Sequence, residues 1–236
     1  MIKRISQTAG FSGLLAALLL TLLQSFWVAP LILEAETYEK APAVEAHEHS
    51  GAAMVGHSHE GHDEEAWEPE DGWQRVLSTT GGNLVVAVGF ALMLAGLYTL
   101  RTPHRTSQGL LWGLAGYATF CLAPTLGLPP ELPGTAAADL LQRQIWWAST
   151  AASTAVAIAL LVFGRHWLLK LLGVAIVVVP HVIGAPQPDV HSSLAPEALE
   201  AQFRIASQLT NAVFWLALGS ISAWLFRRKN DVQHPA

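Results

Sequence analysis

The chain has 236 residues, of which 52% are hydrophobic and only 13% are Asp, Glu, Lys or Arg, and its formal net charge is −5 at pH 7. Soluble domains carry roughly 25% charged residues, so this composition argues against a soluble protein and indicates a membrane protein. The single cysteine, Cys121, excludes a disulfide framework within one chain.

Long uncharged stretches predict an all-α integral membrane protein with about six transmembrane helices, because about 20 apolar residues cross a hydrocarbon core of roughly 30 Å. The expected membrane segments are one helix in 1–33, a hairpin of two helices in 76–130, a second hairpin in 144–188 and a last helix in 205–226. The expected loops and tail are 34–75, 131–143, 189–204 and 227–236.

The first apolar stretch, from Ile5 to Leu33, is longer than the apolar region of a secretory signal peptide, which usually has about 7–15 residues. We therefore favour an uncleaved first helix. Cleavage after Ala35 is the alternative, and it would leave five membrane helices in the same orientation.

The basic residues predict the orientation of the chain. Cytoplasmic loops of membrane proteins are enriched in Lys and Arg. With both termini in the cytoplasm, nine of the thirteen basic residues fall on the cytoplasmic side: Lys3, Arg4, Arg101, Arg105, Arg165, Lys170, Arg227, Arg228 and Lys229. We expect a multi-pass protein of the bacterial inner (cell) membrane, in which loops 34–75, 131–143 and 189–204 face outward.

Loop 34–75 contains a histidine-rich segment. Five histidines lie within sixteen positions among many acidic residues: His47, His49, His57, His59 and His62. Neutral imidazole suits divalent first-row metals, and a His-x-His pair places two imidazoles on one side of an extended backbone. The segment therefore predicts capture of a divalent cation, although a solvated linker is the alternative. Imidazole alone does not select Co²⁺ over Ni²⁺, Cu²⁺ or Zn²⁺.

Carboxylates follow this segment directly before the next membrane helix. Glu68, Glu70 and Asp71 lie between Trp67 and Trp73. Tryptophan favours the membrane interface, so anchoring explains the pair of indoles. The carboxylates could also serve as oxygen ligands at the mouth of a pore.

Three further residues are candidates for contact with an ion. His181 lies in the outer half of a predicted membrane helix, where ionisable residues are costly and indicate function. His191 lies just outside, and Cys121 could act as a thiolate ligand at the pore mouth. The alternatives are a hydrogen-bonded neutral imidazole for His181 and a small buried hydrophobe for Cys121.

Two outer helix ends resemble each other, Pro124-Thr-Leu-Gly127 and Pro180-His-Val-Ile-Gly184. Proline is expected to end or break a helix at each place. Proline-interrupted helices in matching positions point to a transporter site, so the two hairpins are a possible duplication. The chain lacks P-loop, GxSxG and HExxH motifs, and we expect it not to be an enzyme.

The order of these features resembles the CbtA-type family of predicted cobalt transporter subunits. The resemblance rests on the histidine-rich loop and on four further segments: Glu65–Arg75, Ala123–Gly134, Gln142–Trp147 and Pro180–Pro188. It covers nearly the whole chain. It implies Co²⁺ uptake that supports cobalamin biosynthesis, together with a small single-span partner subunit of the CbtB type that also bears histidines.

These observations together favour a membrane subunit of a cobalt or divalent metal uptake transporter whose outer loop captures the ion. We expect no resident cofactor, because the divalent cation is cargo with Co²⁺ favoured. The expected partners are the single-span subunit and membrane lipid, and no nucleic acid. The alternatives are a metal-sensing or scaffold membrane protein, and a nickel or zinc permease on the same scaffold.

Overall fold

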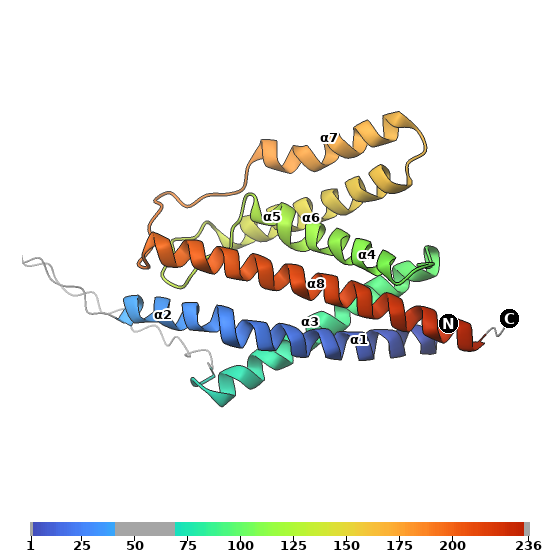
Figure 1. The fold of residues 1–236 in the computed structure, drawn as a ribbon. Coiled ribbons are helices and arrows are strands. Elements are labelled where there is room, and N and C mark those ends of the chain that lie inside the picture. Colours follow the sequence, from blue (N-terminus) through green and yellow to red (C-terminus); the bar gives the residue numbers. More distant parts are fainter. Residues whose placement is uncertain (1, 41–68, 234–236) are drawn as a thin grey trace, which may run out of the picture.

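A computed structural model describes residues 2–40 and 69–233 of the chain, and every regular element in these ranges is a helix apart from one β-bridge between Thr135 and Ser193 (Figure 1). The elements in chain order are α1 (Ile2–Leu23), the π-helical η1 (Gln24–Val28), α2 (Ala29–Lys40), α3 (Trp73–Leu100), α4 (Ser107–Tyr117), the π-helical η2 (Ala118–Leu122), α5 (Ala123–Thr125), α6 (Leu140–Phe163), α7 (Trp167–Ile183) and α8 (Glu197–Gln233). The prediction of an all-α membrane protein is confirmed.

Four helices within the described residues are long and apolar enough to cross a membrane: Ile2–Lys40, Trp73–Leu100, Leu140–Phe163 and Glu197–Arg228. The helix α7 is apolar but has 17 residues, which reach about 25 Å at 1.5 Å per residue. The third predicted membrane helix is interrupted by η2. The count of six membrane helices and the orientation of the termini therefore stay predictions.

The helices extend beyond the predicted membrane segments at several points. The first helix continues past Leu33 to Lys40, and α8 begins at Glu197 rather than at Ile205. A helix does not have to end at a membrane surface, since polar residues such as Glu36 can continue it in water. By contrast, α7 ends at Ile183, where Gly184 with φ +86° adopts a left-handed conformation that favours glycine.

Successive long helices run in alternating directions, so the two termini lie at one end of the molecule (Figure 1). The turn at 101–106 and the turn at 164–166 lie toward this same end. The opposite end gathers the end of α2, the start of α3, the start of α6, the end of α7 and the start of α8. We call these the terminal end and the loop end.

Helices α1, α3, α4 and α8 form a closely packed bundle. Its core contains alanines of α1 and α3 together with large residues such as Phe214, Trp215 and Phe226. At the crossing of α4 and α8, a Cβ atom on Gly113 would lie 2.3 Å from the Trp215 carbonyl oxygen. Small residues allow such close approach of backbones, which is a common way to pack helices within a membrane.

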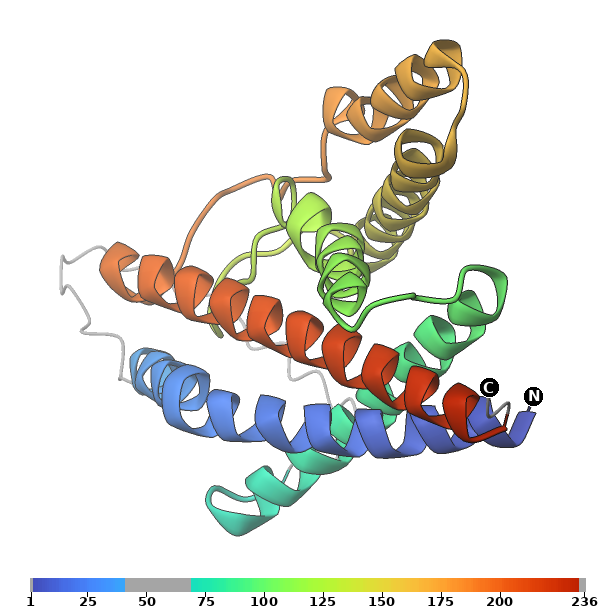
Figure 2. The same cartoon turned by 45° about the vertical axis from the view of Figure 1, so that its right-hand side comes forward.

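The helices α6 and α7 form a hairpin that stands away from this bundle (Figure 2). The hairpin contacts the rest of the protein mainly where α6 meets η2 and α5. Of the seventeen residues of α7, only Gly173 and Pro180 are buried. Several large apolar side chains of α7 are exposed, including Trp167, Leu168, Leu171, Val178, Val182 and Ile183.

Both π-helical segments directly precede an Ala-Pro pair. The segment η1 is followed by Pro30 and η2 by Pro124, which lacks the N–H needed for an α-helical bond. A π-helical turn changes the bonding so that the Ala123 N–H donates to the Ala118 carbonyl. After Pro124 the helix ends at Thr125, which agrees with the expectation that proline ends the helix there.

A hydrogen-bonded chain holds the end of α4 and the end of α5 against α8. Tyr117 Oη–H donates to Gln208 Oε1 at 2.8 Å, and Gln208 Nε2–H donates to Thr125 Oγ1 at 2.7 Å. Thr125 in turn donates to the Cys121 carbonyl at 2.6 Å. These bonds satisfy polar groups in an apolar setting, and they attach the helix end that leads to the hairpin.

Candidate functional site

The candidate site lies at the loop end of the α6–α7 hairpin, where two cavities border Trp146 and a third lies beside them. A groove of about 790 Å³ runs between α6 and α7, and a second cavity of about 440 Å³ is lined in part by His181. A third cavity of about 380 Å³ contains His191. The first two both have Trp146 in their walls.

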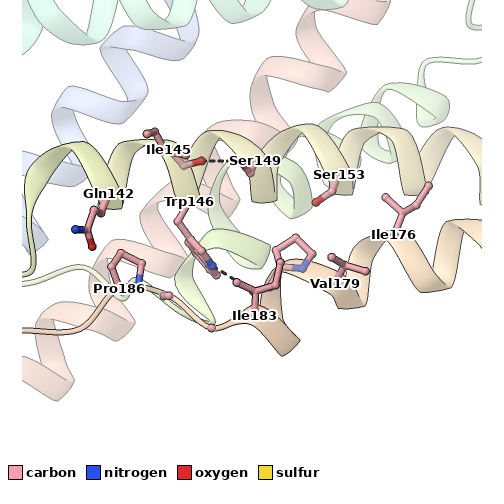
Figure 3. Close-up of a pocket in the computed structure, with 12 residues that line it drawn as sticks. Gln142, Ile145, Trp146, Ser149, Ser153, Ile176, Val179, Ile183 and Pro186 are labelled. Carbon is pink, nitrogen blue, oxygen red and sulfur yellow. Dashed lines mark hydrogen bonds between the residues drawn. The ribbon is translucent and has the colours of Figure 1, made fainter.

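The two helix ends that resemble each other in sequence meet at Trp146. The indole Nε1–H donates to the Pro180 carbonyl oxygen at 3.2 Å, as Figure 3 shows. A Cβ atom on Gly127 would lie 2.4 Å from the Trp146 ring and 2.8 Å from the Cβ of Ala185. Gly127 therefore allows the end of α5, the indole and the end of α7 to pack together. Both helix ends thus contribute to one site.

His181 follows Pro180 on the last turn of α7 and is half-buried. Its ring meets Trp146 edge-to-face, with the two ring centroids 5.9 Å apart. It lines the 440 Å³ cavity together with Leu126, Gly127 and Gln187. The structure thus places this predicted residue on a cavity rather than on a fully packed helix face.

His191 is exposed in the loop between α7 and α8, on the wall of the 380 Å³ cavity. Its Nε2 atom lies 3.2 Å from Gln187 Oε1. Because Gln187 also lines the cavity of His181, this amide connects the surroundings of the two histidines. The structure brings these two predicted residues to neighbouring cavities at the same end of the molecule.

Two ion pairs give the His191 cavity its polar character. Arg143 on α6 lies 2.8 Å from Glu131, and Arg204 on α8 lies 2.8 Å from Glu200. The first pair joins the loop after α5 to the start of α6. Asp139 caps the same helix by accepting a hydrogen bond from the Gln142 N–H at 3.0 Å. These contacts fix the start of α6 and thus the position of Trp146 one helical turn later.

The groove between α6 and α7 differs in chemistry from the other two cavities. Apolar side chains such as Ile145, Ile176, Val179 and Ile183 line most of it (Figure 3). The hydroxyl of Ser149 on its wall donates back to the Ile145 carbonyl of its own helix at 2.7 Å. The groove therefore offers few ligand atoms to a hydrated cation.

The predicted carboxylates at the start of α3 lie in an ion network. Arg75 bonds to Glu36 of α2, and its Nη1 atom lies 2.9 Å from Asp71 Oδ1. Glu70 is exposed and bonds to Gln74. A cation that used Asp71 would have to compete with the Arg75 guanidinium. The role of Glu70 and Asp71 at a pore mouth stays a prediction.

Cys121 lies in η2 and packs against the core of the bundle. It is not among the residues that line the three cavities described above. This position agrees with a small apolar residue and offers no support for a thiolate ligand, which stays a prediction. His47, His49, His57, His59, His62 and Glu68 lie outside the described residues.

Within residues 2–40 and 69–233, no group of three or more His, Cys, Asp or Glu side chains could hold a metal ion. The described part of the site therefore offers an ion single imidazoles, an amide, backbone carbonyls and separate carboxylates, of which Glu131 and Glu200 are paired with arginines.

Sequence reasoning missed Trp146, the Glu131–Arg143 pair and the Glu36–Arg75 pair. Each depends on which helices meet in space. The run Gln-Ile-Trp-Trp before an apolar helix was a signal for the first, but it does not say which indole turns inward.

Comparison with known families gives a direct result. The model of a family described as "Probable cobalt transporter subunit (CbtA)" matches residues 2–227. The chain belongs to this family. The resemblance to CbtA-type proteins is thereby confirmed, and membership together with the long apolar helices identifies a multi-pass membrane protein of cobalt transport. No curated protein and no solved structure matches the chain.

Proposed function

We propose that the chain is the membrane component of a Co²⁺ uptake system in the bacterial inner membrane and that it supports cobalamin biosynthesis. The observation that carries this proposal is the position of His181 on a cavity at the loop end, beside Trp146 and next to the cavity of His191. Membership in a family of cobalt transporter subunits supports the choice of ion.

The proposed topology has six membrane helices with both termini in the cytoplasm. The alternating directions of the helices support it, because both termini lie at one end of the molecule (Figure 1). The turns at 101–106 and 164–166 lie toward the same end and carry Arg101, Arg105 and Arg165. The positive-inside rule then assigns this terminal end to the cytoplasm and the loop end to the outside.

The proposed route begins at the histidine-rich loop. Its imidazoles gather the ion, the carboxylates Glu68, Glu70 and Asp71 attract it to the pore mouth, and His191 passes it to His181. Each contact replaces part of the water shell of the ion while binding modestly, so that the ion can leave again. An interior-negative potential favours entry by about 2.3 kcal/mol per charge per 100 mV, and a divalent ion gains about twice this energy.

The proposed transporter contains a second chain. The family is described as a transporter subunit, and this description supports assembly with at least one further chain. We propose a small single-span subunit of the CbtB type that also bears histidines. The chain then acts in transport and not as an enzyme.

Uptake of ⁵⁷Co²⁺ by cells that express this chain with and without the partner tests the proposal. We expect uptake that resists modest excesses of Ni²⁺ and Zn²⁺ and that increases when the partner is present. Uptake that Ni²⁺ or Zn²⁺ abolishes would indicate a permease for that metal instead. If neither strain takes up Co²⁺ while the protein is in the membrane, the proposal fails and a sensor or scaffold is favoured.

The role of the loop has its own test. Replacement of all five loop histidines by Ser should raise the apparent KM for Co²⁺ and leave the maximal rate nearly unchanged, since the loop only concentrates the ion. A matched control replaces the same number of loop alanines by Ser. A lost maximal rate at saturating Co²⁺ would show that the loop takes part in translocation itself.

A further inference from the structure

We propose that Trp146 is a positioning residue: it separates the cavity of His181 from the apolar groove between α6 and α7 and thereby keeps His181 accessible from the outer aqueous side. The relevance of this separation for transport rests on the proposed function. The separation itself is a property of the fold, and it can be measured without transport.

The indole of Trp146 borders two cavities. Trp146, Gly184 and Ala185 line both the 790 Å³ groove and the 440 Å³ cavity, and the indole is the bulkiest side chain of this shared wall. Its side chain is buried, with 8% exposure, whereas the following Trp147 is 39% exposed. The groove on one side of the indole is lined mostly by apolar residues, whereas the cavity on the other side is lined by His181 and Gln187 among others.

Several contacts hold the indole ring of Trp146 in place. The Pro180 carbonyl accepts a hydrogen bond from the indole N–H at 3.2 Å and another from the Gly184 N–H at 3.0 Å. The His181 ring packs edge-to-face with the indole, and Gly127 lies so close to the indole that an added Cβ atom would be 2.4 Å from it. The indole is therefore fixed on several sides, and it ties the last turn of α7, including His181, to α6.

The position of the indole decides which surroundings a cation at His181 would meet. A charge that faces hydrocarbon loses solvation and is costly, whereas an imidazole next to water can exchange ligands with a hydrated ion. The groove is lined mostly by apolar residues of a hairpin with one helix largely exposed. With the indole in place, His181 faces the polar loop end. Without it, the groove and the His181 cavity join and the imidazole becomes accessible from the apolar side.

Labelling of a cysteine at position 181 tests the separation directly. The protein carries His181→Cys and Cys121→Ser and is reconstituted in lipid nanodiscs. Its labelling rates are measured with a charged, water-soluble thiosulfonate and with a lipid-soluble maleimide. The ratio of the two rates reports the side from which position 181 is accessible.

We expect the charged reagent to be favoured when Trp146 is present. Trp146→Ala should shift the ratio toward the lipid-soluble reagent by about tenfold or more, because a hydrogen bond and the packing of an indole are lost. Trp146→Phe keeps a ring but lacks the donor, so it should give an intermediate ratio. The matched control Trp147→Ala should leave the ratio unchanged. The separation is disproved if Trp146→Ala and Trp147→Ala give the same ratio.

Transport measurements with His181 present complete the test. Trp146→Ala should lower the maximal rate of ⁵⁷Co²⁺ uptake more than it changes the KM, because the outer loop still gathers the ion. An unchanged maximal rate would overturn the positioning role. If the labelling ratio shifts as expected while the unaltered protein takes up no Co²⁺, the proposed function fails but the separation by Trp146 holds.

Discussion

Apolar helices pack differently in two regions of the molecule, the bundle of α1, α3, α4 and α8 and the hairpin of α6 and α7. In the bundle, glycine and alanine bring backbones together, and Gly109 lies against Gly219 so closely that a Cβ atom on either would touch the other's carbonyl oxygen. The hairpin has its main seam between its own two helices, and its loop end is hollow. The close-packed part therefore provides a rigid support, and the hollow part carries the histidine and the cavities.

This difference implies that equivalent substitutions have unequal effects in the two parts. Gly113→Ala in the bundle would push a Cβ atom to 2.3 Å from the Trp215 carbonyl oxygen, which cannot move without its helix. Gly173→Ala in the hairpin meets the Ala157 carbonyl oxygen at 3.1 Å, which requires a small shift. We expect the free energy of unfolding to fall by about 3 kcal/mol for the first and by less than about 1 kcal/mol for the second.

Thermal unfolding in detergent measures this contrast, and about 3 kcal/mol corresponds to a melting temperature lower by roughly 6–12 °C. Gly89→Ala on α3 is the control, because nothing lies within 4 Å of its added Cβ atom. Equal effects of Gly113→Ala and Gly173→Ala would refute the distinction between the two parts.

The ion network at the loop end of the bundle should be the next most sensitive feature. Arg75→Gln removes a guanidinium that joins Glu36 of α2 to Asp71, and it leaves a largely buried carboxylate without that partner. The loss should be about 1–2 kcal/mol. Arg204→Gln breaks a pair within one turn of α8 and should cost only about 0.5 kcal/mol. Chemical unfolding measures the free energy of unfolding of the two variants. Arg75→Gln should remain the more destabilising of the two at low salt.

The polar chain that joins the bundle to the start of the hairpin is the third test. Gln208→Leu removes both the acceptor of Tyr117 and the donor to Thr125. Hydrogen bonds between helices in membranes contribute about 0.6 kcal/mol on average, so the loss should be about 1 kcal/mol. Tyr117→Phe removes one of the two bonds and should have about half the effect. A stabilised Gln208→Leu protein would contradict a holding role for this chain.

The sequence predicted those features that depend on local chemistry. Uncharged stretches predicted the long apolar helices, and Pro124 predicted that a helix ends nearby. His181 was predicted as a residue of the ion pathway, and it does line a cavity, although its role stays a prediction. These features follow from composition and from the backbone properties of single residues.

The missed features depend on contacts between distant segments. Trp146 and Trp147 are chemically identical neighbours, and the packing of α6 against α7 and Gly127 decides that the first is buried. Arg75 meets Glu36 from 39 positions away. The π-helical turns before Pro30 and Pro124 also went unpredicted, because an Ala-Pro pair within an apolar run is equally compatible with a simple kink.

The measurement that tests the account most directly is the initial rate of ⁵⁷Co²⁺ uptake by cells that express the unaltered chain, His181→Ala or His104→Ala, each with the single-span partner and at equal amounts in the membrane. His104 is exposed in the turn between α3 and α4, at the terminal end. The account predicts that His181→Ala loses at least about tenfold in maximal rate, since the ion would lose a ligand during passage and a barrier raised by about 1.4 kcal/mol lowers a rate tenfold, while His104→Ala keeps the original rate. Equal rates for all three proteins would contradict passage of the ion by way of His181.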